Sequence, residues 1–242
     1  MKSTTVSKAV SLLLFLFLIP FLQAQDLKGA WEAELTSEAG VALRSVVIIT
    51  EGYQVATTYE KESGAFVSTN GGKWSLDGNT MTETVEFNTD EGKYVGEDVS
   101  FTIKLTENTL QIDGRETVWK RIDAGQPGKL FGAWLISGRM RAGIMQARDT
   151  NRPRKTMKIL SGTRFQWIAY NTETKQFMGT GGGTYTTENG KYTENIEFFS
   201  RDNSRVGASL EFNFALEDGN WRHSGKSSKG SPIDEVWSPR TN

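Results

Sequence analysis

The segment FVSTNGGKW at residues 66–74 returns 111 residues later as FMGTGGGTY at residues 177–185. The same offset relates residues 48–114 to residues 159–225 without a gap, and 16 of these 67 aligned pairs are identical. An ungapped register of this length, with its turns in the same places, indicates an internal duplication. The chain therefore contains two copies of one domain.

Both copies have the pattern of antiparallel β-structure: short alternating segments separated by Gly, Asn and Asp, with no long helical period. In the first copy we expect strands near residues 28–36, 43–50, 53–60, 65–76, 80–89, 97–106, 108–113 and 115–121. Short turns join neighbouring strands, and an eight-stranded meander usually closes on itself because closure removes exposed edges. The predicted fold is all-β, with two tandem eight-stranded antiparallel up-and-down barrels.

The N-terminus has the pattern of a secretory signal peptide. Lys2 and Lys8 precede an apolar run from Val10 to Leu22, and Ala24 offers a small residue for cleavage. The apolar run is short for a membrane span, and no second run follows. We therefore expect a secreted or periplasmic protein without an integral membrane segment after cleavage. The expected divisions are a signal peptide at 1–24, barrel 1 at 25–123, a linker at 124–128 and barrel 2 at 129–242.

Each copy opens on Gly-x-Trp, at residues 29–31 and 132–134, and ends on a basic residue, Arg121 and Arg240. Together with the eight-strand meander and the duplication, these features resemble the lipocalin-type calycin barrels. The resemblance is to a short, lipocalin-like form found as domains of exported bacterial proteins. Such barrels either fill their interior with side chains or hold one small ligand.

In that family an arginine from the end of the barrel packs over the Gly-x-Trp tryptophan and closes the bottom. The resemblance therefore implies that Arg121 covers Trp31 and that Arg240 covers Trp134. The copies are shorter than secreted lipocalins and lack their disulfide, which bears on the size of any cavity.

The chain offers little catalytic or metal-binding chemistry. It has no cysteine, which excludes disulfides, thiol catalysis and cysteine-ligated metals. His223 is its single histidine; it is either a haem or metal ligand or a core residue, and no second histidine or cysteine could complete a site. Glu83 and Glu194 lie on the apolar face of equivalent strands, as an internal polar network or as a ligand anchor. One inward glutamate per barrel supplies no acid–base partner, so we expect neither an enzyme nor a cofactor.

Charge is distributed unevenly between the copies. Residues 25–125 contain 18 acidic and 9 basic residues, whereas residues 126–242 contain 11 acidic and 17 basic residues. The basic residues gather around an eight-residue insertion after the first strand of copy two. This segment could be an electropositive lid that attracts an anionic amphiphile, a surface that docks barrel 2 onto acidic barrel 1, or a solvated loop. Nucleic acid is not an expected partner of an exported chain whose other half is acidic.

The predicted function is non-catalytic binding of a small apolar or anionic amphiphilic ligand in barrel 2. Barrel 2 is favoured because Gly179, Gly181 and Gly183 replace larger residues of copy one at two of three positions and leave room. The alternative is a protein–protein interaction or scaffold module with barrels filled by side chains. The candidate ligand-binding residues are Arg139, Arg141, Arg148, Arg152, Arg154, Trp167, Tyr185, Glu194, Trp221 and His223.

Overall fold

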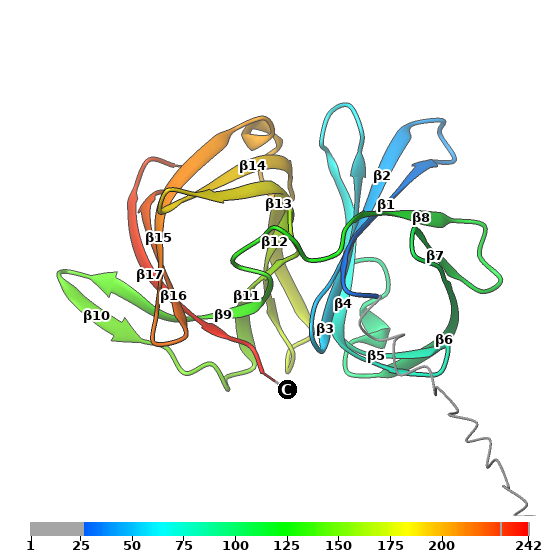
Figure 1. The fold of residues 1–242 in the computed structure, drawn as a ribbon, viewed down its shortest axis with the longest axis horizontal. Helices are drawn as coiled ribbons and strands as arrows, with labels where there is room; N and C mark the ends of the chain where they lie inside the picture. The colour runs from blue at the N-terminus through cyan, green and yellow to red at the C-terminus, as the bar shows by residue number, and fades with distance from the viewer. Residues whose placement is uncertain (1–26, 228, 242) are drawn as a thin grey trace, which may run out of the picture.

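The computed structural model describes residues 27–227 and 229–241. The predicted signal peptide, residues 1–24, lies outside this part of the chain. The described residues form two barrels that lie side by side (Figure 1). Within the described ranges, no helix is long and apolar enough to cross a membrane. The predicted pair of eight-stranded antiparallel barrels is confirmed.

Barrel 1 closes through eight strands in sequence order, with β1 and β8 paired at the seam. The strands are β1 (Gly29–Thr36), β2 (Ala42–Ile49), β3 (Tyr53–Glu60), β4 (Phe66–Asp77), β5 (Thr80–Asn88), β6 (Asp98–Leu105), β7 (Thr109–Ile112) and β8 (Val118–Asp123). A short 3-10 helix, η1 (Gly92–Tyr94), precedes β6. The last strand starts later than expected, because the chain turns after β7 through a backbone bond from Arg115 N to Ile112 O.

Barrel 2 repeats this meander and closes through pairing of its first and last strands. The strands are β9 (Gly132–Arg141), β11 (Arg154–Leu160), β12 (Arg164–Asn171), β13 (Gln176–Glu188), β14 (Lys191–Phe199), β15 (Ser209–Glu217), β16 (Asn220–Lys226) and β17 (Pro232–Pro239). The helix η2 (Asn203–Arg205) lies where η1 lies in barrel 1. A ninth strand, β10 (Ile144–Ala147), extends the sheet beside β9.

The insertion of copy two, for which the sequence left open a lid, a docking surface and a solvated loop, forms a β-hairpin. Ala142 and Gly143 both have positive φ, of 49° and 79°. Two such central residues make the type of tight turn whose twist matches a two-stranded ribbon. Ile144 therefore pairs directly with Arg141, and the hairpin projects away from barrel 2 (Figure 1).

The barrels meet across a pseudo-twofold relationship between equivalent residues. Tyr59 of barrel 1 donates its hydroxyl to Glu197 of barrel 2 over 2.6 Å, and Tyr170 of barrel 2 donates to Glu86 of barrel 1 over 2.5 Å. Both tyrosines and both glutamates are 111 residues apart in the chain. A contact of residue i with j that is matched by j with i defines an isologous interface, as in a twofold homodimer.

The centre of this interface is a hydrophobic core shared by both barrels. Phe66 and its equivalent Phe177 stack on each other, with ring centroids 6.0 Å apart and planes inclined by 8°. Around them lie buried side chains from β2, β3 and β5 and from β9, β11, β12 and β14: Val46, Ile48, Tyr53, Val55, Tyr59, Phe87, Ala133, Leu135, Met157, Ile159, Ile168, Tyr170 and Phe198. The two halves therefore share one packed core in addition to their own.

Polar groups satisfy one another within and around this shared core. Gln166 contacts the hydroxyls of Thr57, Thr69 and Thr180 at 2.6, 3.1 and 2.9 Å. The ion pairs between the barrels are Arg164–Glu32 at 3.0 Å, Arg44–Glu197 at 3.5 Å and Arg240–Glu86 at 2.7 Å. These pairs do not include the basic side chains of the inserted segment.

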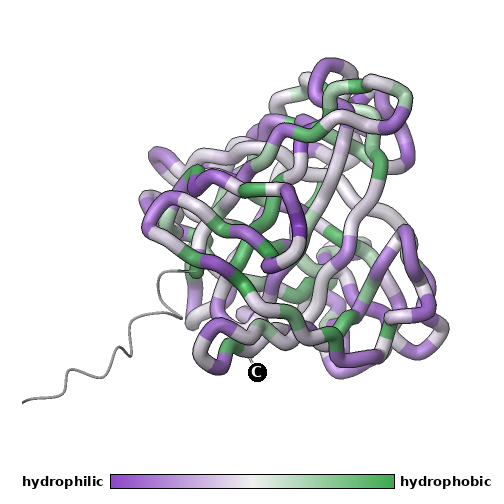
Figure 2. The backbone as a smooth tube through the Cα atoms, turned by 90° about the vertical axis from the view of Figure 1, so that its right-hand side faces the viewer, coloured by the Kyte–Doolittle hydropathy of each residue, from purple (hydrophilic) through white to green (hydrophobic). Residues whose placement is uncertain are grey.

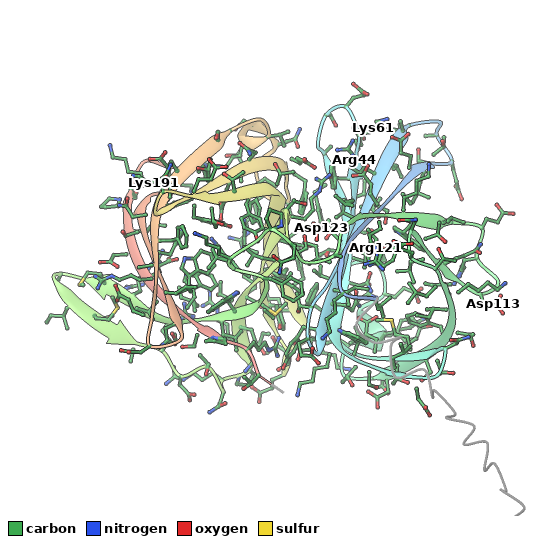
Figure 3. All side chains as sticks on the ribbon, in the orientation of Figure 1. Arg44, Lys61, Asp113, Arg121, Asp123 and Lys191 are labelled. Carbon is green, nitrogen blue, oxygen red and sulfur yellow. The ribbon has the colours of Figure 1, made fainter. Side chains whose placement is uncertain are left out.

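Asp123, the last residue of β8, holds the connection to barrel 2 (Figure 3). Its carboxylate accepts hydrogen bonds from the hydroxyl of Ser161, the amide of Gly162 and both the amide and hydroxyl of Thr163, at 2.6 to 3.0 Å. It also accepts from the amide of Gly125. This carboxylate therefore fixes the end of barrel 1 to the β11–β12 turn of barrel 2.

Candidate ligand-binding site

Barrel 1 contains an open cavity of about 350 Å³. This volume lies within the range of small-molecule pockets. Most of its wall is apolar: Leu35, Val47, Ile49, Ala56, Met81, Phe101, Ile103, Leu110, Ile112 and Trp119. The polar lining residues are Ser45, Gln54, Thr58, Ser68, Asn70, Glu83 and Asp90. A ligand held here would be largely apolar and would meet a few polar groups on β3, β4 and β5.

Strand alternation explains why these side chains point inward. Successive residues of a β-strand face opposite sides of the sheet. In β2, Val47 and Ile49 face the cavity, whereas Val46 and Ile48 face the core shared with barrel 2. This strand is therefore apolar on both faces, unlike the alternating strands on the solvent side of the barrel (Figure 2).

Glu83 is the ionisable group buried in this cavity, with 4% of its surface exposed. Its Oε1 atom has no hydrogen-bond partner among the described residues. Burial raises the pKa of Glu83 to about 7, and the side chains of Gln54 and Asn70 act in the opposite direction. The cavity therefore contains a carboxyl group that changes charge near neutral pH.

One end of barrel 1 is closed as the resemblance implied. The guanidinium of Arg121 lies 4.0 Å from the ring centroid of Trp31 (Arg121 is labelled in Figure 3). Arg121 also donates to the carbonyls of Lys28 at 3.0 Å and Glu107 at 2.5 Å. Trp31 in turn donates its indole N–H to Leu27 O at 2.9 Å. Trp31 belongs to the same core cluster as Val47, Ile49, Met81, Ile103 and Leu110, which line the cavity.

The equivalent expectation for barrel 2 is wrong, because Arg240 does not cover Trp134. The strand β17 ends at Pro239, opposite Trp134, and the chain then reaches barrel 1. There Arg240 lies 4.1 Å from the ring centroid of Tyr53 and donates to both carboxylate oxygens of Glu86, at 2.7 and 2.8 Å. A two-point bond to a carboxylate holds the planar guanidinium at the interface.

Large aromatic side chains and an ion pair pack inside barrel 2. Lys158 and Glu194 form a buried ion pair of 2.7 Å inside it. The ammonium of Lys158 is surrounded by aromatic rings, with centroids at 4.9 to 5.8 Å, from Tyr192, Phe212, Trp221 and Trp237. Trp221 and Tyr192 have no exposed surface. Glu194 and Trp221, candidate ligand contacts from the sequence, are therefore parts of a packed core.

His223 belongs to the same packed interior. Its ring lies 4.2 Å from that of Phe212, and its Nδ1 lies 3.5 Å from a carboxylate oxygen of Glu235. Burial and the charge of Lys158 lower the pKa of His223, so the imidazole is neutral at physiological pH. Within the described residues, no group of three or more His, Cys, Asp or Glu side chains could hold a metal ion.

The room expected from the glycines of β13 is occupied by aromatic side chains. A Cβ atom on Gly181 would lie 2.7 Å from the indole nitrogen of Trp167 and 2.9 Å from the ring of Phe199. One on Gly183 would lie 2.0 Å from Asn195 O. The glycines admit neighbouring rings and backbone, not a ligand. Tyr185 is likewise buried and donates its hydroxyl to Ser161 O at 2.6 Å.

The five candidate arginines lie on β9, on the segment between β9 and β11 and at the start of β11: Arg139, Arg141, Arg148, Arg152 and Arg154. Arg148 lies near Arg154, Arg139 and Arg141. Burial lowers the pKa of Arg148, and the charges of these three neighbours lower it further. Arg139 reaches inward to Glu235, at 2.8 Å. Glu235 also lies 3.5 Å from His223, so Arg139 connects the arginines of this segment with the interior of barrel 2.

The two barrels differ in bulk at equivalent positions. Residues lining the cavity of barrel 1 are replaced in barrel 2 by larger ones at several positions, among them Val47 by Lys158, Ala56 by Trp167, Met81 by Tyr192, Ile103 by Phe214 and Leu110 by Trp221. These exchanges place larger side chains inside barrel 2 at positions that border the cavity in barrel 1. They were present in the aligned repeat, and comparing side-chain volumes there would have pointed to barrel 1.

Neither a protein-family model nor a curated protein matches this chain. Among solved structures, it is similar to the Cpx pathway activator NlpE from Escherichia coli, with 10% sequence identity over 89% of this chain and 93% of that one, and a TM-score of 0.26. A similarity at this level carries no inference about the chain.

Proposed function

We propose that this chain is an exported, non-catalytic binding protein whose barrel 1 holds a small, largely apolar ligand. The observation that carries the proposal is the cavity of about 350 Å³ with mostly apolar walls. Exposing such a wall to water is unfavourable, and an apolar ligand that covers it gains free energy. The proposal moves the ligand from barrel 2, where the sequence had placed it, to barrel 1.

The chemistry of the cavity supports binding without catalysis. Of the residues that line it, Glu83 and Asp90 carry acid groups, and Asp90 is exposed. General acid–base catalysis needs a second group within hydrogen-bond reach of the reacting atoms, and nucleophilic catalysis needs an activated nucleophile. Export is supported by the signal-peptide pattern of residues 1–24, which favours a secreted or periplasmic location.

The proposal is tested with the neutral, environment-sensitive dye prodan and the chain without residues 1–24. We expect saturable binding of one dye per chain, with a blue shift of its emission. Leu110→Trp, which copies Trp221 of barrel 2, should fill the cavity and abolish binding. Thr102→Trp adds the same side chain to the exposed face of β6 and should leave binding intact. Unchanged binding to a folded Leu110→Trp variant would refute a site in barrel 1.

A second function is favoured by a separate observation, the shape and charge of the β9–β10 hairpin. It presents Ile144, which is 68% exposed, beside an arginine cluster, while barrel 1 carries an excess of acidic residues. This complementarity supports an interaction module in which the hairpin of one chain docks on barrel 1 of a second copy. Sedimentation velocity should then show self-association that salt and Arg141→Glu both abolish. A chain that stays monomeric at low salt would exclude this function.

A further inference from the structure

We propose that the ligand of barrel 1 carries a cationic amine, and that this group pairs with Glu83 in the place that Lys158 occupies in barrel 2. The inference rests on the proposed function and specifies the chemical class of the ligand. It follows from comparing the same site in a filled copy and a hollow copy of one domain.

The two glutamates occupy the same place in their barrels. Glu83 pairs with Trp74 on one side and Val99 on the other. Glu194 pairs with their equivalents, Tyr185 and Leu210. Both glutamates are buried, with 4% and 5% of their surface exposed.

The partner of the glutamate is present in one barrel and missing in the other. In barrel 2, Lys158 pairs with Trp134 in the sheet and places its ammonium 2.7 Å from Glu194. In barrel 1, the residue that pairs with the equivalent Trp31 is Val47. Val47 and Glu83 both line the cavity, so the position that supplies the ammonium in barrel 2 supplies an apolar side chain in barrel 1.

The surroundings of the missing cation are partly retained. Lys158 lies over the rings of Phe212 and Trp237, at 5.8 and 5.3 Å. Their equivalents in barrel 1, Phe101 and Trp119, line the cavity. Aromatic faces attract ammonium groups through the ring quadrupole. An amine that enters the cavity would therefore meet a carboxylate and two aromatic side chains of the kind that hold Lys158.

Electrostatics favours this ligand class over an anionic one. A buried carboxylate without an opposite charge is costly, and removing one partner of a buried pair leaves that cost uncompensated. A ligand ammonium restores the pair, whereas a fatty-acid carboxylate would add a second negative charge beside Glu83. The arginines of copy two suggested an anionic amphiphile as the ligand. None of the residues that line this cavity is an arginine.

The test compares three ligands with the same chain length: n-octylamine, n-octanol and octanoate. Each displaces prodan from the chain without residues 1–24 at pH 8. We expect n-octylamine to act at a concentration about tenfold below that of n-octanol, because a hydrogen bond to a charged group is stronger than one between neutral groups. Octanoate should be the weakest of the three.

Two variants connect the preference to Glu83. Glu83→Gln keeps the shape of the side chain and should reduce the preference for octylamine over octanol to near unity, while prodan still binds. Val47→Lys installs the lysine of barrel 2 and should abolish octylamine binding. Asp77→Asn removes an exposed carboxylate from the same barrel and should change neither result.

The outcomes separate this inference from the function on which it rests. If prodan does not bind, or binds equally to Leu110→Trp, the binding function itself fails. If prodan binds in barrel 1 but the three ligands compete equally, or if Glu83→Gln keeps the amine preference, the function stands and the amine is overturned. If n-octanol instead competes better than n-octylamine, in the wild-type chain and in Asp77→Asn alike, the ligand carries a neutral hydrogen-bond donor and not an ammonium group.

Discussion

Val47 lies in barrel 1 at the position that Lys158 holds in barrel 2, each paired with the Gly-x-Trp tryptophan of its own barrel. This difference leaves Glu83 beside a cavity, while the equivalent Glu194 is neutralised. In barrel 2 these two positions form a structural ion pair, and in barrel 1 the equivalent positions form a candidate binding site for a cation.

The pH dependence of stability should carry the signature of Glu83. Its pKa rises from 4.5 to about 7 on folding, so the carboxyl favours the folded state fully below pH 4.5 and loses that contribution as the pH rises through 7. Glu83→Gln should therefore stabilise the chain at pH 8, relative to its effect at pH 4, by up to about 3 kcal/mol. Urea unfolding of both proteins across this range measures the difference. A pH-independent difference would contradict the assignment.

Ligand binding should follow the same ionisation in the opposite sense. An alkylamine stays protonated up to about pH 10, whereas Glu83 becomes charged as the pH rises through 7. The affinity for n-octylamine should therefore increase between pH 5.5 and 8, and that for n-octanol should not. Prodan displacement at several pH values provides the comparison, with Glu83→Gln as the control that removes the slope.

Breaking the ion pair of barrel 2 should be costly. Lys158→Met leaves Glu194 charged among aromatic side chains, and the loss of one partner of a buried pair costs about 3–5 kcal/mol. Adding Glu194→Gln to Lys158→Met should recover part of this loss, because the uncompensated charge disappears. Urea unfolding of the two single variants and the double variant measures the coupling. Additive effects would show that the two groups do not act as a pair.

The pseudo-twofold interface predicts matched effects of two distant substitutions. Tyr59→Phe and Tyr170→Phe each remove a hydroxyl that donates to a glutamate of the other barrel. Each should lower the free energy of unfolding by about 1.5–3 kcal/mol, the usual contribution of a hydrogen bond to a charged group. Differential scanning calorimetry should show a single unfolding transition, because the two barrels share a core. Two separate transitions in the wild-type chain would mean that the barrels unfold independently.

Asp123→Ala should loosen the connection between the barrels. The substitution removes the acceptor of the amides of Gly162 and Thr163 and leaves these groups without that partner. Hydrogen exchange at these two amides should accelerate, while exchange along β5 and β6 should stay unchanged. Equal acceleration throughout barrel 1 would indicate global destabilisation and not a local joint.

The sequence was sufficient for the architecture because periodicity and repetition act locally. The alternation of β-strands, the unbroken register from Ile48 to Gly114 and the pair of Trp31 with Arg121 all appear in the structure. The position of the cavity depends on volume summed over many strands, which periodicity does not measure. The aligned exchange of Leu110 for Trp221 contained that information, but only a closed barrel shows that both side chains reach the same space.

Two other features depended on the path of the chain beyond the repeat. Ala142 and Gly143 supply a two-residue turn, so the inserted segment, for which the sequence left three roles open, is a hairpin. Arg240 follows the end of β17 and forms an ion pair with Glu86 of the other barrel. The sequence pattern of a single barrel could not predict this contact. The apolar residues on both faces of β2 were the signal that this strand is covered on both sides.

The isologous interface makes this chain a covalently joined dimer of its own domain. Two separate domains held by such a surface would dissociate on dilution, whereas joined domains meet at a fixed effective concentration. Neither half then has to be stable alone. A hollow interior forgoes packing energy, and a densely packed neighbour that cannot diffuse away compensates for it. In this chain the barrel with the cavity stays attached to a neighbour with a packed interior, which suits the binding function that we propose for barrel 1.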